Sequence, residues 1–182
     1  MIPLPRVLSV AASSEHGFSK QVRATIEVVA GLGVAGDAHA GTTVKHCSRV
    51  RVDPTQPNLR QVHLIQGELL AELAGRGFAV GPGDLGENIL TTGIDLLALP
   101  RASVLAIGPS ARLEVTGLRN PCAQIEAFQP GLYAAVLDKG PDGSLIRKAG
   151  IMTIVLAGGP IMPDDEISVD LPPPPHHPLE RV

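Results

Sequence analysis

Short apolar segments, each ended by glycine or proline, follow one another along almost the whole of this sequence. In residues 21–31, every second position is apolar: Val22, Ala24, Ile26 and Val28. This period of two predicts a half-buried strand. Similar segments predict strands at 6–13, 60–65, 87–91, 102–108, 111–117, 149–158 and 165–171. The chain should therefore be rich in short strands.

Helical patterns are few and short. Residues 66–77 place three leucines at helical spacing and stop at two glycines. Further helices are expected near Pro121 and over residues 131–138. A doubly wound α/β fold needs long helices between its strands, and the sequence does not offer them. We therefore predict a mainly β (α+β) fold, closed or nearly closed into a barrel-like domain, with a few peripheral helices.

The length of 182 residues favours one domain, which we place at residues 1–171. Residues 172–182 contain four consecutive prolines, so we expect an extended or disordered tail. A net charge of −3, with three Phe, one Tyr and no Trp, argues against nucleic-acid binding. The N-terminus does not resemble a signal peptide, and no apolar run is long enough to span a bilayer. We expect a soluble, cytoplasmic protein without membrane contact.

Two segments match the dinucleotide-binding pattern G-x-G-x-x-G, at residues 31–36 and 81–86. The first follows a predicted strand, and Asp53 lies about where a ribose-binding acid would be. Residues 37–48 are a poor helix former, however, so the pyrophosphate would lack its helix N-terminus. The second segment contains Pro82 and precedes a β-like segment, which favours a tight turn.

Residues 31–58 form a long polar loop with a short β-like segment at 49–52, and such loops are usually functional or mobile. His39 lies in this loop and is a candidate catalytic proton donor or acceptor, with a surface role as the alternative. His46 and Cys47 suggest zinc, but a fourth ligand is missing and the spacing fits no zinc module.

Cys122 is the most informative single residue. Asn120 is a natural N-cap, and Pro121 suits the first position of a helix, so Cys122 is expected in the first helical turn. The helix dipole and neighbouring Arg119 would lower the thiol pKa, which suits a nucleophile, a sulfur carrier or a soft-metal ligand. A buried, inert thiol is the alternative. A disulfide with Cys47 is disfavoured without a secretory signal.

Four segments occur in an order that resembles the MOSC domain family, named for the C-terminal domain of molybdenum cofactor sulfurase. They are GDAHAG at 36–41, GDLGENILTTGIDL at 83–96, LAIGPSARLEVTGLRNPCAQIE at 105–126 and AGIMTIVLAGGPI at 149–161. The resemblance covers most of residues 5–170 and implies a mainly β, barrel-like fold with peripheral helices.

The resemblance also implies a function for Cys122, which is the motif cysteine. Family members carry sulfur on this cysteine or ligate molybdenum with it, and the latter reduce N-hydroxylated compounds, as in the mitochondrial amidoxime-reducing component. The family is also associated with pyridoxal phosphate enzymes. The implied cofactor is molybdopterin, and the implied partners are a small N-hydroxylated substrate and a redox or sulfur-donor protein. The second hypothesis is a non-catalytic binding or regulatory domain without bound cofactor.

An anionic pterin phosphate needs cations and hydrogen-bond donors. Arg119 can pair bidentately with phosphate, or it can be an ordinary surface arginine. Asn120 is a second candidate contact, with helix capping as the alternative. Glu87 and Asn88 lie in the matched block and either contact the cofactor or satisfy N–H groups of the glycine turn before them. His63 is expected to be a packed or surface residue of its strand, and His176 and His177 lie in the proline-rich tail and need no site.

Overall fold

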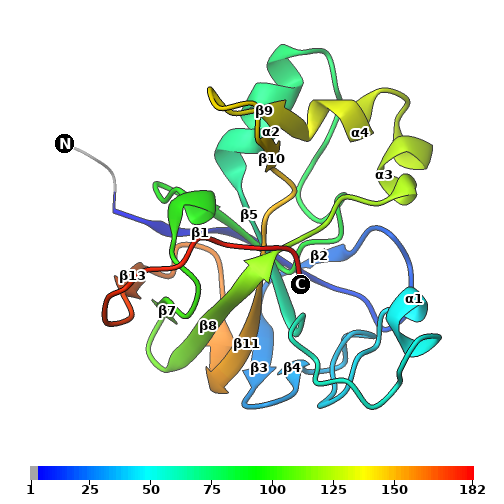
Figure 1. Cartoon of the computed structure of the whole chain (residues 1–182). Coiled ribbons are helices and arrows are strands. Elements are labelled where there is room, and N and C mark those ends of the chain that lie inside the picture. Colours follow the sequence, from blue (N-terminus) through cyan, green and yellow to red (C-terminus); the bar gives the residue numbers. More distant parts are fainter. Residues whose placement is uncertain (1–3) are drawn as a thin grey trace.

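The computed structural model describes residues 4–182, and an eight-stranded sheet forms most of it (Figure 1). In spatial order the strands are β13 (Ile167–Asp170), β7 (Val104–Ile107), β8 (Ala111–Leu118), β11 (Ile151–Ala157), β5 (Val62–Gln66), β6 (Ile89–Thr92), β1 (Arg6–Ala12) and β2 (Gln21–Arg23). Neighbouring strands are antiparallel except β5 and β6, which are parallel.

Two smaller sheets and several short helices complete the fold. One small sheet has the order β12 (Gly159–Ile161), β3 (Ile26–Val29) and β4 (Gly33–Val34), and the other pairs β9 (Leu137–Lys139) with β10 (Leu145–Arg147). The helices are α1 (Cys47–Val50), α2 (Gly67–Gly75), α3 (Ala123–Phe128), α4 (Leu132–Ala135) and the 3₁₀ turn η1 (Leu96–Ala98). Because even α2 has only nine residues, the prediction of a mainly β fold with a few helices is confirmed.

The predicted closed or nearly closed barrel-like arrangement is not confirmed. The outer strands β13 and β2 do not pair, so the large sheet is open. An isolated bridge between Arg6 and Glu166 and backbone hydrogen bonds that join residues 164–167 to Pro5 and Val7 connect the start of β1 with the start of β13. The sheet therefore curves enough to bring these two strands close together, although β13 and β1 do not pair as strands of one closed sheet.

The core has two parts. The larger cluster lies within the sheets and consists mainly of valine, leucine and isoleucine, as the scarcity of aromatic residues predicts. The second cluster joins α2, α3 and α4 to the sheet through Leu69, Leu73, Ile125 and Leu132. These helices and the β9–β10 hairpin lie together at the top of Figure 1. The second cluster thus fixes the position of α3, whose N-terminus carries Cys122.

Two local predictions were wrong. The alternating segment 21–31 is not one strand, because it divides into β2 and β3 in different sheets and leaves Val22 exposed. The β-like segment 49–52 lies in α1 and the turn after it. The expectation that the segment after Gly36 forms no helix agrees with the structure, because no helix occurs in residues 37–46 and the segment 31–36 lacks the element that would bind pyrophosphate.

The C-terminal segment 172–182 is extended and lies against the end of β8. The backbone N–H of Leu118 donates to Glu180 O at 2.7 Å, and that of Arg101 donates to His177 O at 2.9 Å. Gly117 allows this approach, because a Cβ atom there would collide with the Glu180 carbonyl. The segment therefore covers part of β8 that β7 leaves unpaired.

No helix within residues 4–182 is both long and apolar enough to cross a bilayer.

Candidate functional site

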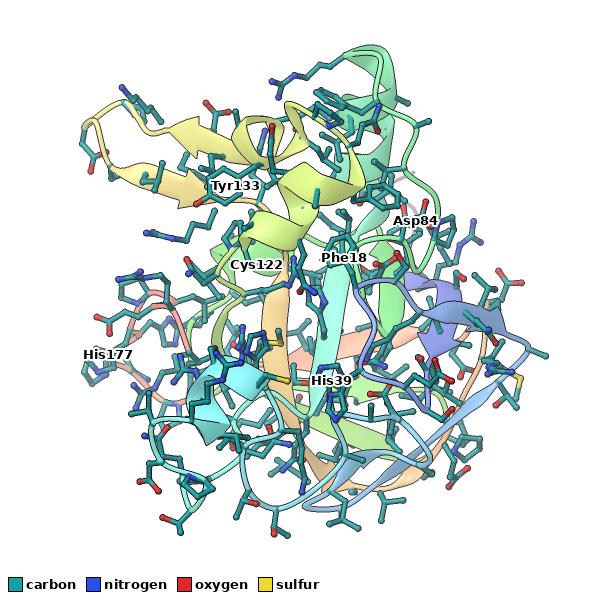
Figure 2. All side chains as sticks on the ribbon, turned by 90° about the vertical axis from the view of Figure 1, so that its right-hand side faces the viewer. Phe18, His39, Asp84, Cys122, Tyr133 and His177 are labelled. Carbon is teal, nitrogen blue, oxygen red and sulfur yellow. The ribbon has the colours of Figure 1, made fainter. Side chains whose placement is uncertain are left out.

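A cavity of about 240 Å³ opens beside Cys122 and is strongly basic. Figure 2 shows this face, with Phe18, His39 and Cys122 labelled. Five cationic side chains line the cavity: Lys20, Lys45, Arg49, Arg60 and Arg119. No Asp or Glu side chain of the described residues lines it. Since the whole chain carries a net charge of −3, this local excess of cations favours an anionic ligand.

The cavity brings together parts of the chain that are far apart in sequence. Its lining comes from residues 17–20, from the loop 39–60, from β5, and from residues 119–124. Of the predicted site residues, it includes His39, Asn88, Arg119, Asn120 and Cys122. Glu87 lies behind the lining and is buried.

Cys122 does not occupy the first turn of a helix, which corrects the prediction. Its backbone is extended, with φ −124° and ψ 168°, and it is the N-cap residue of α3, which begins at Ala123. Asn120 is therefore not the cap and is exposed at the cavity. The Cys122 side chain is half-buried, and its Sγ lies 3.6 Å from Gln124 Oε1. Cys122 and Cys47 are both free thiols, so no disulfide joins them.

Arg119 and Arg60 present buried hydrogen-bond donors that have no protein partner. Arg119 Nη1 and Arg60 Nε are both inaccessible to solvent and unpaired among the described residues. Burial lowers the pKa of Arg119, and burial with repulsion from Arg49 and Arg119 lowers that of Arg60 to about 10. A Cys122 thiolate would oppose the lowering of both pKa values, and the three side chains line the same cavity. We call Arg60, Arg119 and Cys122 the arginine–thiol cluster.

Aromatic packing holds the Arg119 guanidinium in place. Its Cζ atom lies 5.9 Å from the centroid of the Phe18 ring, in cation–π geometry. The Phe18 ring contacts that of Phe128 on α3, with centroids 5.7 Å apart. The backbone N–H of Arg119 donates to Gly150 O at 3.0 Å. Phe18 thus packs against the guanidinium and Gly150 anchors the Arg119 backbone, while Nη1 has no hydrogen-bond partner among residues 4–182.

The opposite side of the cavity is a fully paired group centred on Asp37, whose side chain is 1% exposed. Asp37 Oδ2 accepts hydrogen bonds from Lys20 Nζ at 2.8 Å, Asn88 Nδ2 at 3.1 Å and Ser13 N at 3.2 Å. Asp37 Oδ1 accepts from His39 N at 2.9 Å and lies 3.2 Å from His39 Nδ1. We call Ser13, Lys20, Asp37, His39 and Asn88 the Asp37 cluster.

Burial and pairing act in opposite directions within the Asp37 cluster. Burial would raise the pKa of Asp37, but hydrogen bonds from His39 and attraction to Lys20 outweigh it and lower the pKa. Burial lowers the pKa of Lys20 despite the attraction of Asp37. Asp37 is therefore ionised, and Lys20 is its buried counterion.

Glu87 and Asn88 both satisfy backbone groups of the surrounding loops. Glu87 Oε1 accepts a short hydrogen bond from Gly83 N, in the glycine turn before β6. Its Oε2 is buried without a hydrogen-bond partner in the described part of the chain, and burial raises the Glu87 pKa to about 7. Asn88 Oδ1 accepts from His63 N at 3.2 Å, and Asn88 Nδ2 donates to Ala11 O at 3.1 Å.

The other histidines differ in their surroundings. His63 lines the cavity and is buried; Nε2 lies 2.7 Å from Ala149 O, and burial lowers its pKa well below the usual value. Burial and nearby Arg60 lower the pKa of His46 to about 4, so both histidines are neutral at pH 7. Within residues 4–182, no three His, Cys, Asp or Glu side chains are grouped to hold a metal ion, which disfavours zinc.

Three residues of the site were missed at the level of sequence: Lys20, Asp37 and Arg60. Asp37 stands in the quoted block GDAHAG, so its two-residue spacing from His39 was an available signal. Lys20 and Arg60 have no such local signal. Only the fold brings them to the cavity.

A family model described as the MOSC domain matches residues 36–168. The chain belongs to the MOSC domain family. The resemblance inferred from four sequence segments is therefore confirmed. A search of curated proteins found no match.

Solved structures agree with this family. The YuaD protein from Bacillus subtilis is 26% identical with a TM-score of 0.74, covering 92% of this chain and 96% of that one. YiiM from Geobacillus stearothermophilus is 17% identical with a TM-score of 0.62, covering 91% and 75%. YiiM from Escherichia coli is 17% identical with a TM-score of 0.60, covering 93% and 71%. At 17% identity, the two YiiM matches establish only a shared fold with this MOSC domain.

Proposed function

We propose that this MOSC domain binds a molybdopterin-type cofactor, or accepts its sulfur, at the arginine–thiol cluster. One observation carries the proposal: two guanidinium groups, each with a buried N–H donor that has no partner among residues 4–182, line the same cavity as a free thiol, and no described carboxylate lines it. Leaving a buried charged donor unpaired is costly, so an anionic ligand that pairs with it gains affinity. A thiolate is also a soft ligand that suits such a metal.

The donor set fits the phosphate and the metal of this cofactor. Arg119 and Arg60 would hold the phosphate, with Asn120 at the cavity surface as a further hydrogen-bonding group. Cys122 would ligate the molybdenum. When bound, the cofactor would supply the redox change that removes oxygen from an N-hydroxylated substrate. A volume of about 240 Å³ is small for a drug-sized ligand, so part of the cofactor would lie at the mouth.

In the sulfur-carrier version, the Cys122 thiolate attacks the terminal sulfur of a persulfide on a donor protein. A new S–S bond forms on Cys122, and the S–S bond of the donor breaks. The donor leaves as a thiolate, so electrons and atoms balance without another reactant. The half-buried Cys122 side chain is accessible to such a donor.

Anaerobic reconstitution with molybdenum cofactor tests this proposal. We expect the wild-type protein to retain stoichiometric molybdenum and Cys122→Ser to lose it, with Cys47→Ser as the matched control. Equal retention by wild type and Cys122→Ser would exclude the metal-ligand role. After sulfur loading, mass spectrometry should find a persulfide on Cys122, and its absence would exclude the carrier role.

A non-catalytic binding domain is the second candidate, and the small cavity volume favours it. Such a domain would bind an oxyanion through Arg60 and Arg119 without using the thiol. Calorimetric titration with inorganic phosphate then gives equal affinity for wild type and Cys122→Ser. If neither protein retains molybdenum, the two results together support the non-catalytic binding domain.

A further inference from the structure

We propose that Asp37 is a positioning residue that holds His39 in a single tautomer, with Nε2 free to exchange a proton with the ligand in the cavity. The proposal rests on the function proposed above, because His39 lines the same cavity as Cys122. It assigns a role to a buried acid that ligand binding and sulfur transfer leave unused.

The hydrogen bonds of Asp37 fix the orientation of its carboxylate. Lys20, Asn88 and Ser13 all donate to Oδ2, which leaves Oδ1 facing His39. Oδ1 contacts both the backbone N and the ring Nδ1 of His39. Since donors from separate segments hold both oxygens, the carboxylate cannot rotate away from the imidazole.

An ionised carboxylate accepts hydrogen bonds and cannot donate them. The Nδ1 atom of His39 must therefore carry the proton in the contact with Asp37 Oδ1. Neutral His39 then has its lone pair on Nε2. This atom can take a proton from a ligand O–H or N–H group and later return it, so that one bond to hydrogen forms as another breaks.

The surroundings of His39 leave Nε2 available. The side chain is 29% exposed, and Nε2 has no hydrogen-bond partner among the described residues. His16 contacts the ring edge-on, with centroids 5.4 Å apart. The charged or titratable groups facing His39 are Asp37 with Lys20 behind it, His16, and His46 across the cavity.

Nitrogen NMR of ¹⁵N-labelled protein at neutral pH tests the proposal directly. We expect His39 to show the Nδ1–H tautomer in the wild type, with His39→Gln used to assign the signal. In Asp37→Asn, the amide oxygen should face the three donors at Oδ2 and the NH₂ group should face the His39 ring, and the variant then loses the hydrogen bond from His39 N to Oδ1. His39 would then accept at Nδ1 and carry its proton on Nε2.

His16→Gln is the matched control, because it alters the neighbour of His39 without touching Asp37, and its His39 should keep the Nδ1–H tautomer. If Asp37→Asn does not fold, the double variant Lys20→Met with Asp37→Asn replaces it, because this variant also removes the lysine that has lost its counterion. The tautomer of His39 in the wild type tests the proposal independently of either variant. In reconstituted protein that reduces an N-hydroxylated compound, Asp37→Asn should lower kcat about 10²- to 10⁴-fold at unchanged KM.

An Nε2–H tautomer of His39 in the wild type, or a tautomer that Asp37→Asn leaves unchanged, would overturn the proposal. These results are separate from molybdenum retention. If the protein binds no cofactor but His39 shows the expected tautomer, only the proposed function is refuted. If the protein binds the cofactor but His39 shows the other tautomer, only the positioning role of Asp37 is refuted.

Discussion

The two sides of the cavity differ in how completely their polar atoms are paired. In the Asp37 cluster, both oxygens of the carboxylate have donors, and the buried cation lies 2.8 Å away. In the arginine–thiol cluster, Nη1 of Arg119 and Nε of Arg60 have no acceptor within residues 4–182. A protein interior seldom leaves such donors unpaired. The Asp37 cluster therefore stabilises the structure of the site, whereas the arginine–thiol cluster has donors with which to bind a ligand.

Breaking the Lys20–Asp37 pair should give the largest effect on stability. Lys20→Met leaves the carboxylate of Asp37 buried without its counterion, which should cost about 3 to 5 kcal/mol of unfolding free energy. Urea denaturation measures this cost. A loss below about 1 kcal/mol would mean that Ser13, His39 and Asn88 satisfy the carboxylate alone.

Glu87 should give stability a pH dependence of opposite sign to that of a normal ion-paired acid. Its pKa rises from 4.5 to about 7 on folding, so the folded state binds the proton more tightly. Protonated Glu87 therefore contributes on the order of 3 kcal/mol to the free energy of unfolding below about pH 4.5. This contribution is lost as the pH rises through about 7.

Glu87→Gln should remove that dependence, because the amide is neutral and its oxygen still accepts from Gly83 N. Urea unfolding of both proteins between pH 4.5 and 8 measures the difference. Parallel stability curves for the two proteins would show that the Glu87 pKa is not raised.

Arg119→Met should weaken ligand binding without weakening the fold. Losing a charge-assisted hydrogen bond costs about 1.5 to 3 kcal/mol, which reduces phosphate affinity about 10- to 150-fold. Because Nη1 is buried and has no partner among the residues that the structure describes, the unfolding free energy should stay the same or rise. Calorimetric titration and urea denaturation give the two values, and Arg112→Met, outside the cavity lining, is the control. A destabilised Arg119→Met variant with normal phosphate affinity would make Arg119 a structural residue.

Cys122→Ser should have the smallest effect on the fold. The side chain is half-buried and makes one weak contact, to Gln124, so the unfolding free energy should change by less than about 0.5 kcal/mol. Thermal denaturation measures this change. A drop of several degrees in Tm would favour the inert, packed thiol over the reactive one.

Much of the fold follows from the sequence, because burial on one face of a strand or helix leaves a local pattern. The hairpin of β7 and β8, the helix α2 and the strands β1, β5 and β11 were all predicted from such patterns. The segment 21–31 shows the limit of this approach. Its alternation is regular, yet β2 and β3 pair with different sheets, and alternation does not encode the partner of a strand.

The start of α3 was decided by contacts that the local sequence does not contain. Asn120 and Pro121 favour a helix start by their own preferences. In the structure, Arg119 pairs with Gly150 just before β11, and the backbone stays extended through Cys122. A tertiary hydrogen bond thus placed the cysteine at the N-cap.

By itself, the sequence determined a mainly β domain, membership in the MOSC family, and Cys122 with Arg119 as candidate site residues. The tertiary structure alone decided that Lys20 and Arg60 reach this cavity, that the sheet stays open, and that residues 172–182 lie along β8. The physical reason is the distance along the sequence over which the relevant interactions act. Strand and helix patterns arise between neighbours in sequence, whereas the charge and pairing of a cavity depend on side chains that only folding brings together.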